Sequence, residues 1–202
     1  MSHDTQLRQR IAQISARLIV QEGITDYQQA KVKAAARLGV INNRYLPSNS
    51  EIEEEISLYH RLFQAGTQPL RVQKLRQIAL DAMQLLIRFN PRLVGPVLQG
   101  TAHQHSHIIL HLFTYADEEV AIFLMEKNIP YCLGEIKFRL PQPVIFPSYQ
   151  FIAGEETIVL IIFGVDDIRW SPPSPIDGKP MRRADIKTVS LLVKQDTLPK
   201  TP

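Results

Sequence analysis

Four histidines lie close together in the middle of the chain, at His103, His105, His107 and His111. On a β-strand, His105, His107 and His111 would point to one face, because their spacing is even. Imidazole nitrogen suits zinc and other transition-metal ions, so one hypothesis is a metal site made by these three side chains. The alternative is a polar turn in which the histidines are satisfied by hydrogen bonds. No HExxH pattern or Cys-His spacing accompanies the cluster, which favours the polar turn.

Two arginines, Arg182 and Arg183, follow the sequence Asp177-Gly178-Lys179. An arginine fork is well suited to phosphate, so one interpretation is that this pair contacts a phosphate group in a cleft. The other interpretation is that the pair anchors the preceding proline-rich loop to the carboxylates around Asp166 and Asp167. The pattern favours neither over the other.

A second basic group lies nearer the N-terminus and consists of Lys31, Lys33, Arg37 and Arg44. Such a group can bind the phosphate backbone of a nucleic acid. A solvated helix face is the commoner outcome, and the acidic residues that follow over 51–55 can pair with it. A nucleotide, an RNA and another protein therefore all remain possible partners.

A glycine turn and a following apolar segment form the most informative motif. The chain runs Val94-Gly95-Pro96-Val97-Leu98-Gln99-Gly100 and continues after a short gap as His105-Ser106-His107-Ile108-Ile109-Leu110. This arrangement resembles the signature of polymerase-β-type nucleotidyltransferases, in which Gly-Ser or Gly-Gly precedes a strand that reads acid, apolar, acid, apolar. Gly95 falls on the first glycine, His107 on the first acid and Ile109 on the second. The segments 22–35 and 174–183 are also similar to bacterial proteins that join a helical N-terminus to such a core.

The resemblance implies a fold, a ligand and a set of contacts. It implies a mixed-sheet core and a nucleotide bound near the glycine turn. Magnesium is the cofactor that an active member would use. The residues it marks for nucleotide contact are Gly95, Gly100, Thr101, Ser106, Arg182 and Arg183.

The positions that should hold magnesium are occupied by other residue types. Magnesium prefers oxygen ligands, and two acids two residues apart on a strand point to the same side and can hold two metals. Ile109 supplies no ligand atom, and His107 supplies a nitrogen, which magnesium disfavours. Pro96 replaces the expected serine and has no backbone N–H. The candidate strand for the third family carboxylate, 157–163, contains no acid, although Glu155 and Glu156 flank it.

Apolar periodicity predicts the elements that would position this motif. Helical spacing, capping patterns and glycine stops predict four helices over roughly the first ninety residues, with capping boxes at Thr25–Gln28 and Ser48–Glu51 and a helix from Pro69 to Phe89. Beyond Asn90 the segments become short and β-branched. We expect strands at 93–98, 108–114, 131–138, 144–152 and 157–163, and helices at 116–127 and 184–193. The prediction is an α+β protein with a helical region at 1–90 and a nucleotidyltransferase-like core at 91–202.

Composition sets outer limits on these hypotheses. The chain has 202 residues, 45% of them hydrophobic, with a formal net charge of +3. A single cysteine, Cys132, excludes an internal disulfide, and its apolar neighbours predict a buried structural thiol. The N-terminus has no apolar signal core and the longest apolar run, 158–163, is too short to cross a bilayer, so we expect a cytoplasmic protein without membrane association.

Three functional hypotheses follow. The first is a nucleotidyltransferase-fold protein that lacks metal-dependent catalysis and acts as a nucleotide-binding, regulatory or interaction module. The second is an active, magnesium-dependent nucleotidyltransferase that draws its carboxylates from Glu155, Glu156 or Asp166. The third is an unrelated α+β interaction domain, which strands at Leu93 and Ile108 that are not neighbours would favour. The oligomeric state and the partner do not follow from the sequence.

Overall fold

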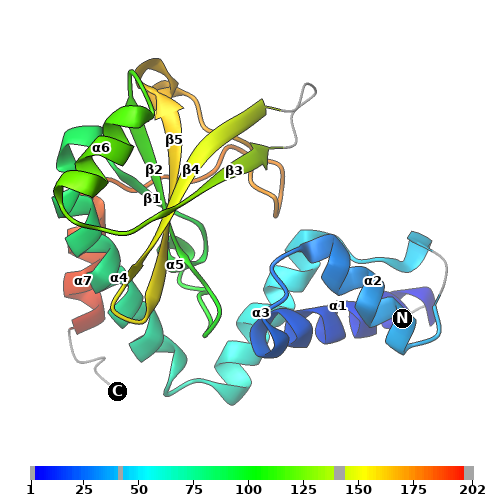
Figure 1. Ribbon diagram of the computed structural model, residues 1–202. Helices are drawn as coiled ribbons and strands as arrows, with labels where there is room; N and C mark the ends of the chain where they lie inside the picture. Colours follow the sequence, from blue (N-terminus) through cyan, green and yellow to red (C-terminus); the bar gives the residue numbers. More distant parts are fainter. Residues whose placement is uncertain (1–2, 41–42, 139–143, 198–202) are drawn as a thin grey trace. The chain divides into compact units, whose positions relative to one another are not determined.

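The structure is a computed structural model that describes residues 3–40, 43–138 and 144–197. It divides into two units, each of which we describe separately (Figure 1). The helical unit comprises Met1–Gln68, His103–Ser106 and Pro175–Gly178, and the sheet unit comprises Pro69–Ala102, His107–Ser174 and Lys179–Pro202. The division therefore lies earlier than the expected boundary at residue 90.

In its described residues the helical unit contains three α-helices and a short 3-10 turn: α1 (His3–Glu22), α2 (Tyr27–Arg37), η1 (Asn43–Tyr45) and α3 (Asn49–Phe63). The predicted capping box at the start of α3 is present, with Ser48 and Glu51 each accepting from the other's backbone N–H. Helix α2 is capped one residue later than predicted, because the carboxylate of Asp26 accepts from the N–H of Gln29 at 2.7 Å. Small and branched side chains allow close packing of α1 against α3, where Ala16, Ile52 and Ile56 share a core.

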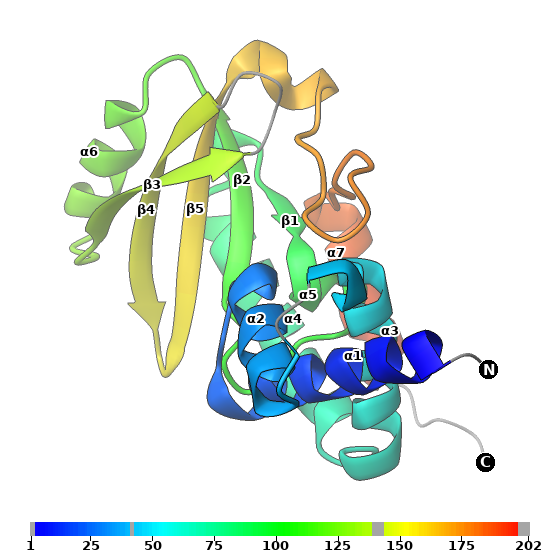
Figure 2. The same cartoon turned by 90° about the vertical axis from the view of Figure 1, so that its right-hand side faces the viewer.

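The sheet unit contains a five-stranded mixed sheet in the order β1-β2-β5-β4-β3. Its strands are β1 (Arg92–Val94), β2 (Ile108–Thr114), β3 (Cys132–Phe138), β4 (Val144–Ala153) and β5 (Glu156–Gly164). Strands β2 and β5 are parallel, and the other neighbours are antiparallel. Together with the helices, this sheet confirms the α+β prediction. Figure 2 turns the molecule so that the strand order can be followed from β3 to β1.

Three helices pack on one face of the sheet, which we call the helix-covered face (Figure 1). They are α4 (Gln68–Leu85), α6 (Glu118–Glu126) and α7 (Ile186–Thr197). Their buried residues share one core with the inward side chains of the two central strands, among them Leu110 and Leu160. Since α4 contributes Leu75, Ala79 and Met83 to this core, it belongs with the sheet.

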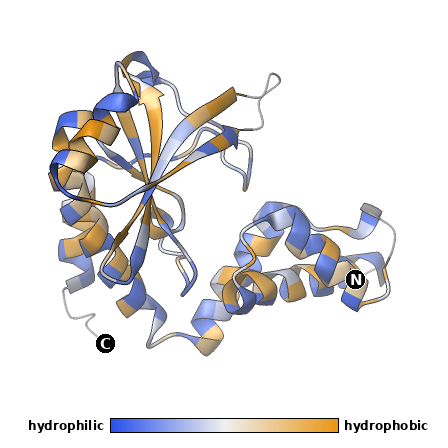
Figure 3. Cartoon of the chain, viewed as in Figure 1, coloured by the Kyte–Doolittle hydropathy of each residue, from blue (hydrophilic) through white to orange (hydrophobic). Residues whose placement is uncertain are grey.

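The opposite face of the sheet carries a second, smaller cluster, which we call the aromatic face. Its buried members are Phe113, Ile161 and Phe163, and the partly buried residues packed on them are Ile109, Ile136, Phe138, Phe146, Val159 and Ile168. Both faces of β2 and β5 are therefore apolar, and Figure 3 shows these central strands as largely hydrophobic. Strands buried on both faces read as continuous apolar runs, which explains the composition of 108–114 and 157–163.

One predicted strand is wrong. The segment 93–98 is not a single strand, because β1 ends at Val94 and a short helix, α5 (Gly95–Gln99), follows directly. Gly95 turns the chain with φ +72°, a conformation that favours glycine, and Pro96 suits the first turn of a helix. None of the described helices combines the length and the apolar character needed to span a bilayer.

Candidate functional site

The glycine turn joins β1 to α5 and places Gly95 beside β2. Val94 pairs with Ile109 in the antiparallel register of β1 and β2. A Cβ at position 95 would meet the Ile109 side chain at 3.5 Å, which is an ordinary contact. The positive φ of Gly95, rather than a close approach, is what requires glycine at this position.

The next two positions that the resemblance marks for nucleotide contact belong to the end of α5. The N–H groups of Gly100 and Thr101 both donate to the carbonyl of Pro96, at 2.9 and 3.0 Å. Arg76 fixes the same turn by donating to the carbonyls of Val97 and Leu98, each at 3.0 Å. These backbone donors therefore close the turn and are not directed at a ligand.

The two acid positions of the motif differ sharply in environment. His107 is exposed and precedes β2. Ile109 lies within β2, next to Val159 on the parallel strand β5, and both pack in the aromatic face. These two branched aliphatic side chains have no atom that could bind a metal ion.

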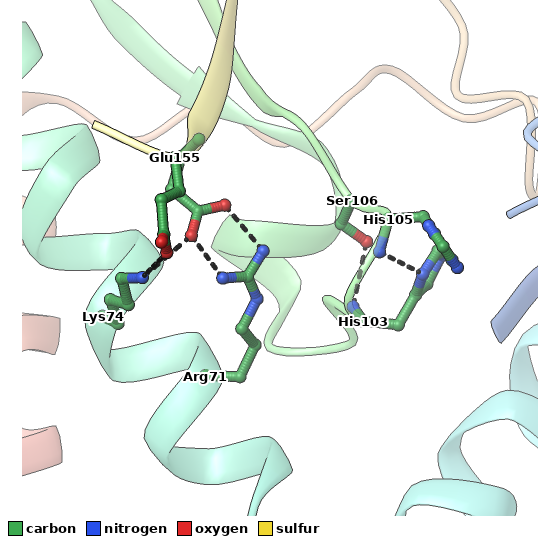
Figure 4. Close-up of polar contacts among 7 residues, drawn as sticks. Arg71, Lys74, His103, His105, Ser106 and Glu155 are labelled. Carbon is green, nitrogen blue, oxygen red and sulfur yellow. Dashed lines mark hydrogen bonds and ion pairs between the residues drawn. The ribbon is translucent and has the colours of Figure 1, made fainter. Parts of the chain in front are cut away.

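The residues 103–106 form a polar turn within the helical unit (Figure 4). The hydroxyl of Ser106 accepts from the N–H of His103 at 2.9 Å, and the N–H of His105 donates to Nδ1 of His103 at 3.2 Å. The ring of His105 also lies 3.3 Å from the carbonyl of Gln21. Ser106 therefore has a structural role in closing the turn.

The three-histidine metal site is not supported by this geometry. Strand β2 begins at Ile108, so His105 and His107 precede it and the argument from even spacing does not apply to them. Across the described part of the chain, no group of three or more His, Cys, Asp or Glu side chains lies together in a way that could hold a metal ion.

His111 and Arg183 meet on the aromatic face. His111 is fully buried in the middle of β2, and Nε of Arg183 donates to its Nδ1 at 3.0 Å. An imidazole that accepts through Nδ1 is neutral and carries its proton on Nε2. Among the described residues, neither Nε2 of His111 nor Nη2 of Arg183 has a hydrogen-bond partner.

The electrostatics of this pair follow from burial. Burial lowers the pKa of His111 to about 3, and the adjacent positive charge of Arg183 adds to the effect. Burial also lowers the pKa of Arg183 to about 10, so the guanidinium remains charged at neutral pH. The guanidinium carbon lies 4.9 Å from the ring centroids of both Phe113 and Phe163, which is the geometry of a cation–π contact.

Arg183 reaches this position because the segment after the proline-rich loop pairs with β1. The backbones of Leu93 and Ala184 exchange two hydrogen bonds, each of 2.9 Å. Ala184 and Leu93 both face the helix-covered core, so the neighbouring Arg183 side chain is directed to the aromatic face. There Nη1 donates to the backbone carbonyls of Asp167 and Trp170, so Arg183 holds this segment through carbonyls rather than through the expected carboxylates. Arg182, by contrast, is exposed.

The acids near the start of β5 form ion pairs with α4 (Figure 4). The guanidinium of Arg71 binds both oxygens of Glu156, and Nζ of Lys74 lies 3.2 Å from Oε1 of the same carboxylate. These partners, Arg71 foremost, lower the pKa of Glu156. Glu155 is mostly exposed and its Oε2 lies 3.4 Å from Lys74.

The three acids proposed for a displaced catalytic site do not come together. Glu155 and Glu156 lie at the start of β5, whereas Asp166 follows its end at Gly164. Glu156 and Gly164 are eight residue steps apart along β5, a distance of about 26 Å at 3.3 Å per residue. A metal or phosphate at one end of β5 cannot be reached from the other.

The basic group of the helical unit is partly neutralised within that unit. Nζ of Lys33 lies 2.6 Å from Glu22, and Arg37 lies 2.8 Å from the same carboxylate. Lys31 is buried, and burial lowers its pKa. Lys33 and Arg37 thus form ion pairs with Glu22 on α1 rather than with the acidic residues over 51–55.

Two features of the sheet unit differ from the predictions or were not predicted. Cys132 was expected to be buried, but it is exposed on β3 at the outer edge of the sheet. The Arg183–His111 contact joins residues 72 positions apart, so no local sequence pattern predicts it. Side chains two residues apart on a strand share a face, so His111 lies on the same face as Ile109. This spacing is the sequence signal that could have identified His111 as a candidate site residue.

Comparison with known proteins gives no family for this chain. Neither a scan against models of protein families nor a search of curated proteins found a match.

Proposed function

We propose that the sheet unit is a nucleotidyltransferase-like core that does not carry out two-metal transfer and serves as a nucleotide-binding or regulatory module. The observation that carries this proposal is the pairing of Ile109 with Val159 in the aromatic face. Neither side chain has an oxygen with which to hold magnesium.

The order of elements supports the nucleotidyltransferase-like half of the proposal. A short strand, a glycine turn with positive φ, a helix and a second strand follow one another from Arg92 to Thr114. The two strands are neighbours, with Leu93 opposite Leu110. This adjacency favours the proposal over an unrelated interaction domain, for which separated strands were expected.

An active transferase with displaced carboxylates has less support. Glu156 is held by Arg71 and Lys74, and Asp166 lies at the other end of β5. A bidentate arginine–carboxylate pair is a common structural contact and leaves the carboxylate little capacity to bind magnesium.

Calorimetric titration of the full chain with ATP, CTP, GTP and UTP, with and without Mg²⁺, tests the proposal. We expect binding of at least one nucleotide with an affinity that is the same in both conditions. Replacing Arg182, the exposed arginine of the marked pair, by glutamine should weaken that binding. The matched control is Lys187→Gln, which removes one exposed charge from α7.

Two outcomes would count against the proposal. Binding that requires Mg²⁺ would show that carboxylates form a metal site and would restore catalysis as the leading interpretation. Absence of binding to all four nucleotides would remove the nucleotide-binding function and leave regulation through a protein or RNA partner.

A further inference from the structure

The outer edge of the sheet is formed by β3. Within the described residues its strand partner is β4 on one side, and no strand pairs with it on the other. Most of its side chains are exposed, including Leu133, which is 74% exposed. An edge of this kind presents a row of backbone N–H and C=O groups that another strand can pair with.

The side chains of β3 alternate between the two faces of the sheet. Glu135 and Lys137 lie on one face, while Gly134, Ile136 and Phe138 lie on the other. Ile136 and Phe138 pack into the aromatic face of their own sheet. The strand therefore carries one negative and one positive charge on the same face, two residues apart.

This charge pattern is complementary to itself under two-fold symmetry. When two identical strands pair antiparallel about an axis perpendicular to the sheet, paired residues lie on the same face and the axis passes through one residue position. With the axis at Ile136, Glu135 of each copy lies opposite Lys137 of the partner subunit. With the axis at Glu135 or at Lys137, two like charges would lie directly opposite each other, which is destabilising.

A second feature supports the same register. With the axis at Ile136, Phe138 of one copy lies opposite Gly134 of the partner subunit. The Phe138 ring packs against Phe146 and Phe163 of its own sheet, so no side chain opposes another at this pair. Opposite charges on one face and the absence of a steric conflict on the other thus favour the same alignment.

We propose that two copies of this chain associate through their β3 edges, antiparallel and centred on Ile136, so that the two sheets become one. A second copy fits this edge better than an unrelated extended peptide does, because a peptide would have no reason to match the symmetric order of charges. This inference does not depend on the proposed nucleotide binding.

Sedimentation velocity of the full chain over a concentration series tests this interface. We expect the wild type to form dimers, and Lys137→Glu to raise the dissociation constant roughly tenfold or more, because two opposite-charge pairs become like-charge pairs. Glu135→Lys should have a similar effect. The double variant Glu135→Lys/Lys137→Glu restores opposite charges in the same register and should restore the dimer.

The controls separate this interface from others. Lys187→Glu reverses an exposed charge on α7 and should leave the dimer unchanged. Circular dichroism of every variant verifies the fold. A wild type that is monomeric throughout the series, a dimer that neither single reversal weakens, or a double variant that stays dissociated would each overturn the proposal.

Discussion

The two faces of the sheet are built from alternate residues of the same strands, yet they differ in chemistry. On β2, Ile108, Leu110 and Leu112 face the helices and are fully buried in an aliphatic core. The intervening residues face the other way, where His111 receives a hydrogen bond from Arg183 amid phenylalanine rings. One face is a core of aliphatic side chains, and the other holds a partly buried cation and a buried, neutral imidazole.

This difference bears on function because the second acid position of the motif, Ile109, lies on the aromatic face. A core on the helix-covered face is expected in any α+β protein. Apolar packing of Ile109 and Val159 on the opposite face indicates that these two positions contribute packing rather than metal binding. Variants that act on one face only can test this distinction.

The largest expected effect comes from the helix-covered face. Leu110→Ala removes a fully buried side chain from a tightly packed core and should lower the free energy of unfolding by about 2–5 kcal/mol. The Ile109 side chain is only partly buried, so Ile109→Ala should lower the free energy of unfolding by no more than about half as much. Chemical denaturation of both variants measures the difference. Equal losses would mean that the two faces do not differ in packing.

The next effect concerns acid stability and belongs to the aromatic face. The pKa of His111 is lowered to about 3 by burial, whereas an unfolded histidine titrates near 6.5. The unfolded state therefore binds more protons in this window, so stability falls as the pH decreases from 6.5 toward 3. Between pH 6.5 and 5 this amounts to about 1.6 kcal/mol.

His111→Phe removes that titration while keeping an aromatic ring. We expect the variant to lose less stability than the wild type between pH 6.5 and 5, measured by urea denaturation at each pH. His60→Phe is a matched histidine change in the helical unit. A pH dependence that is the same in His111→Phe and the wild type would contradict the buried, neutral assignment of His111.

A smaller effect separates the two adjacent arginines. Arg183→Met removes the cation–π contacts and the hydrogen bonds to the backbone carbonyls of Asp167 and Trp170. It should lower the free energy of unfolding by about 1–2 kcal/mol. Arg182→Met changes an exposed side chain and should stay within about 0.5 kcal/mol of wild type. Thermal denaturation suffices for this comparison. A larger loss of stability in Arg182→Met than in Arg183→Met would show that Arg183 does not stabilise the segment around Asp167 and Trp170.

The elements with strong periodicity could be predicted from the sequence. Strand β2 has the predicted bounds, because a largely apolar run is preceded by a polar segment at 103–107 and followed by an irregular segment at 115–117. The short helix α5 was missed because its apolar residues also suit a strand, and only the positive φ of Gly95 decides between the two. The capping box at Ser48 was predicted correctly because both partners lie within four residues.

The candidate site was less accessible to prediction. The motif positions Gly95 and Ile109 do lie beside each other, as paired strands require. The contact of Arg183 with His111 depends on the backbone bridge at Ala184, which joins distant segments. The exposure of Cys132 depends on β3 being the edge strand, and strand order is not encoded in the local apolar pattern.

The most direct test of the central claim is metal binding itself. Mn²⁺ can replace Mg²⁺ at oxygen sites, and the electron paramagnetic resonance signal of free Mn²⁺ decreases when the ion is bound. For each nucleotide, we compare the signal of Mn²⁺ with nucleotide alone and after the full chain is added. We expect the two signals to be the same. A further, saturable decrease caused by the protein would show a metal site in the chain and would contradict the account.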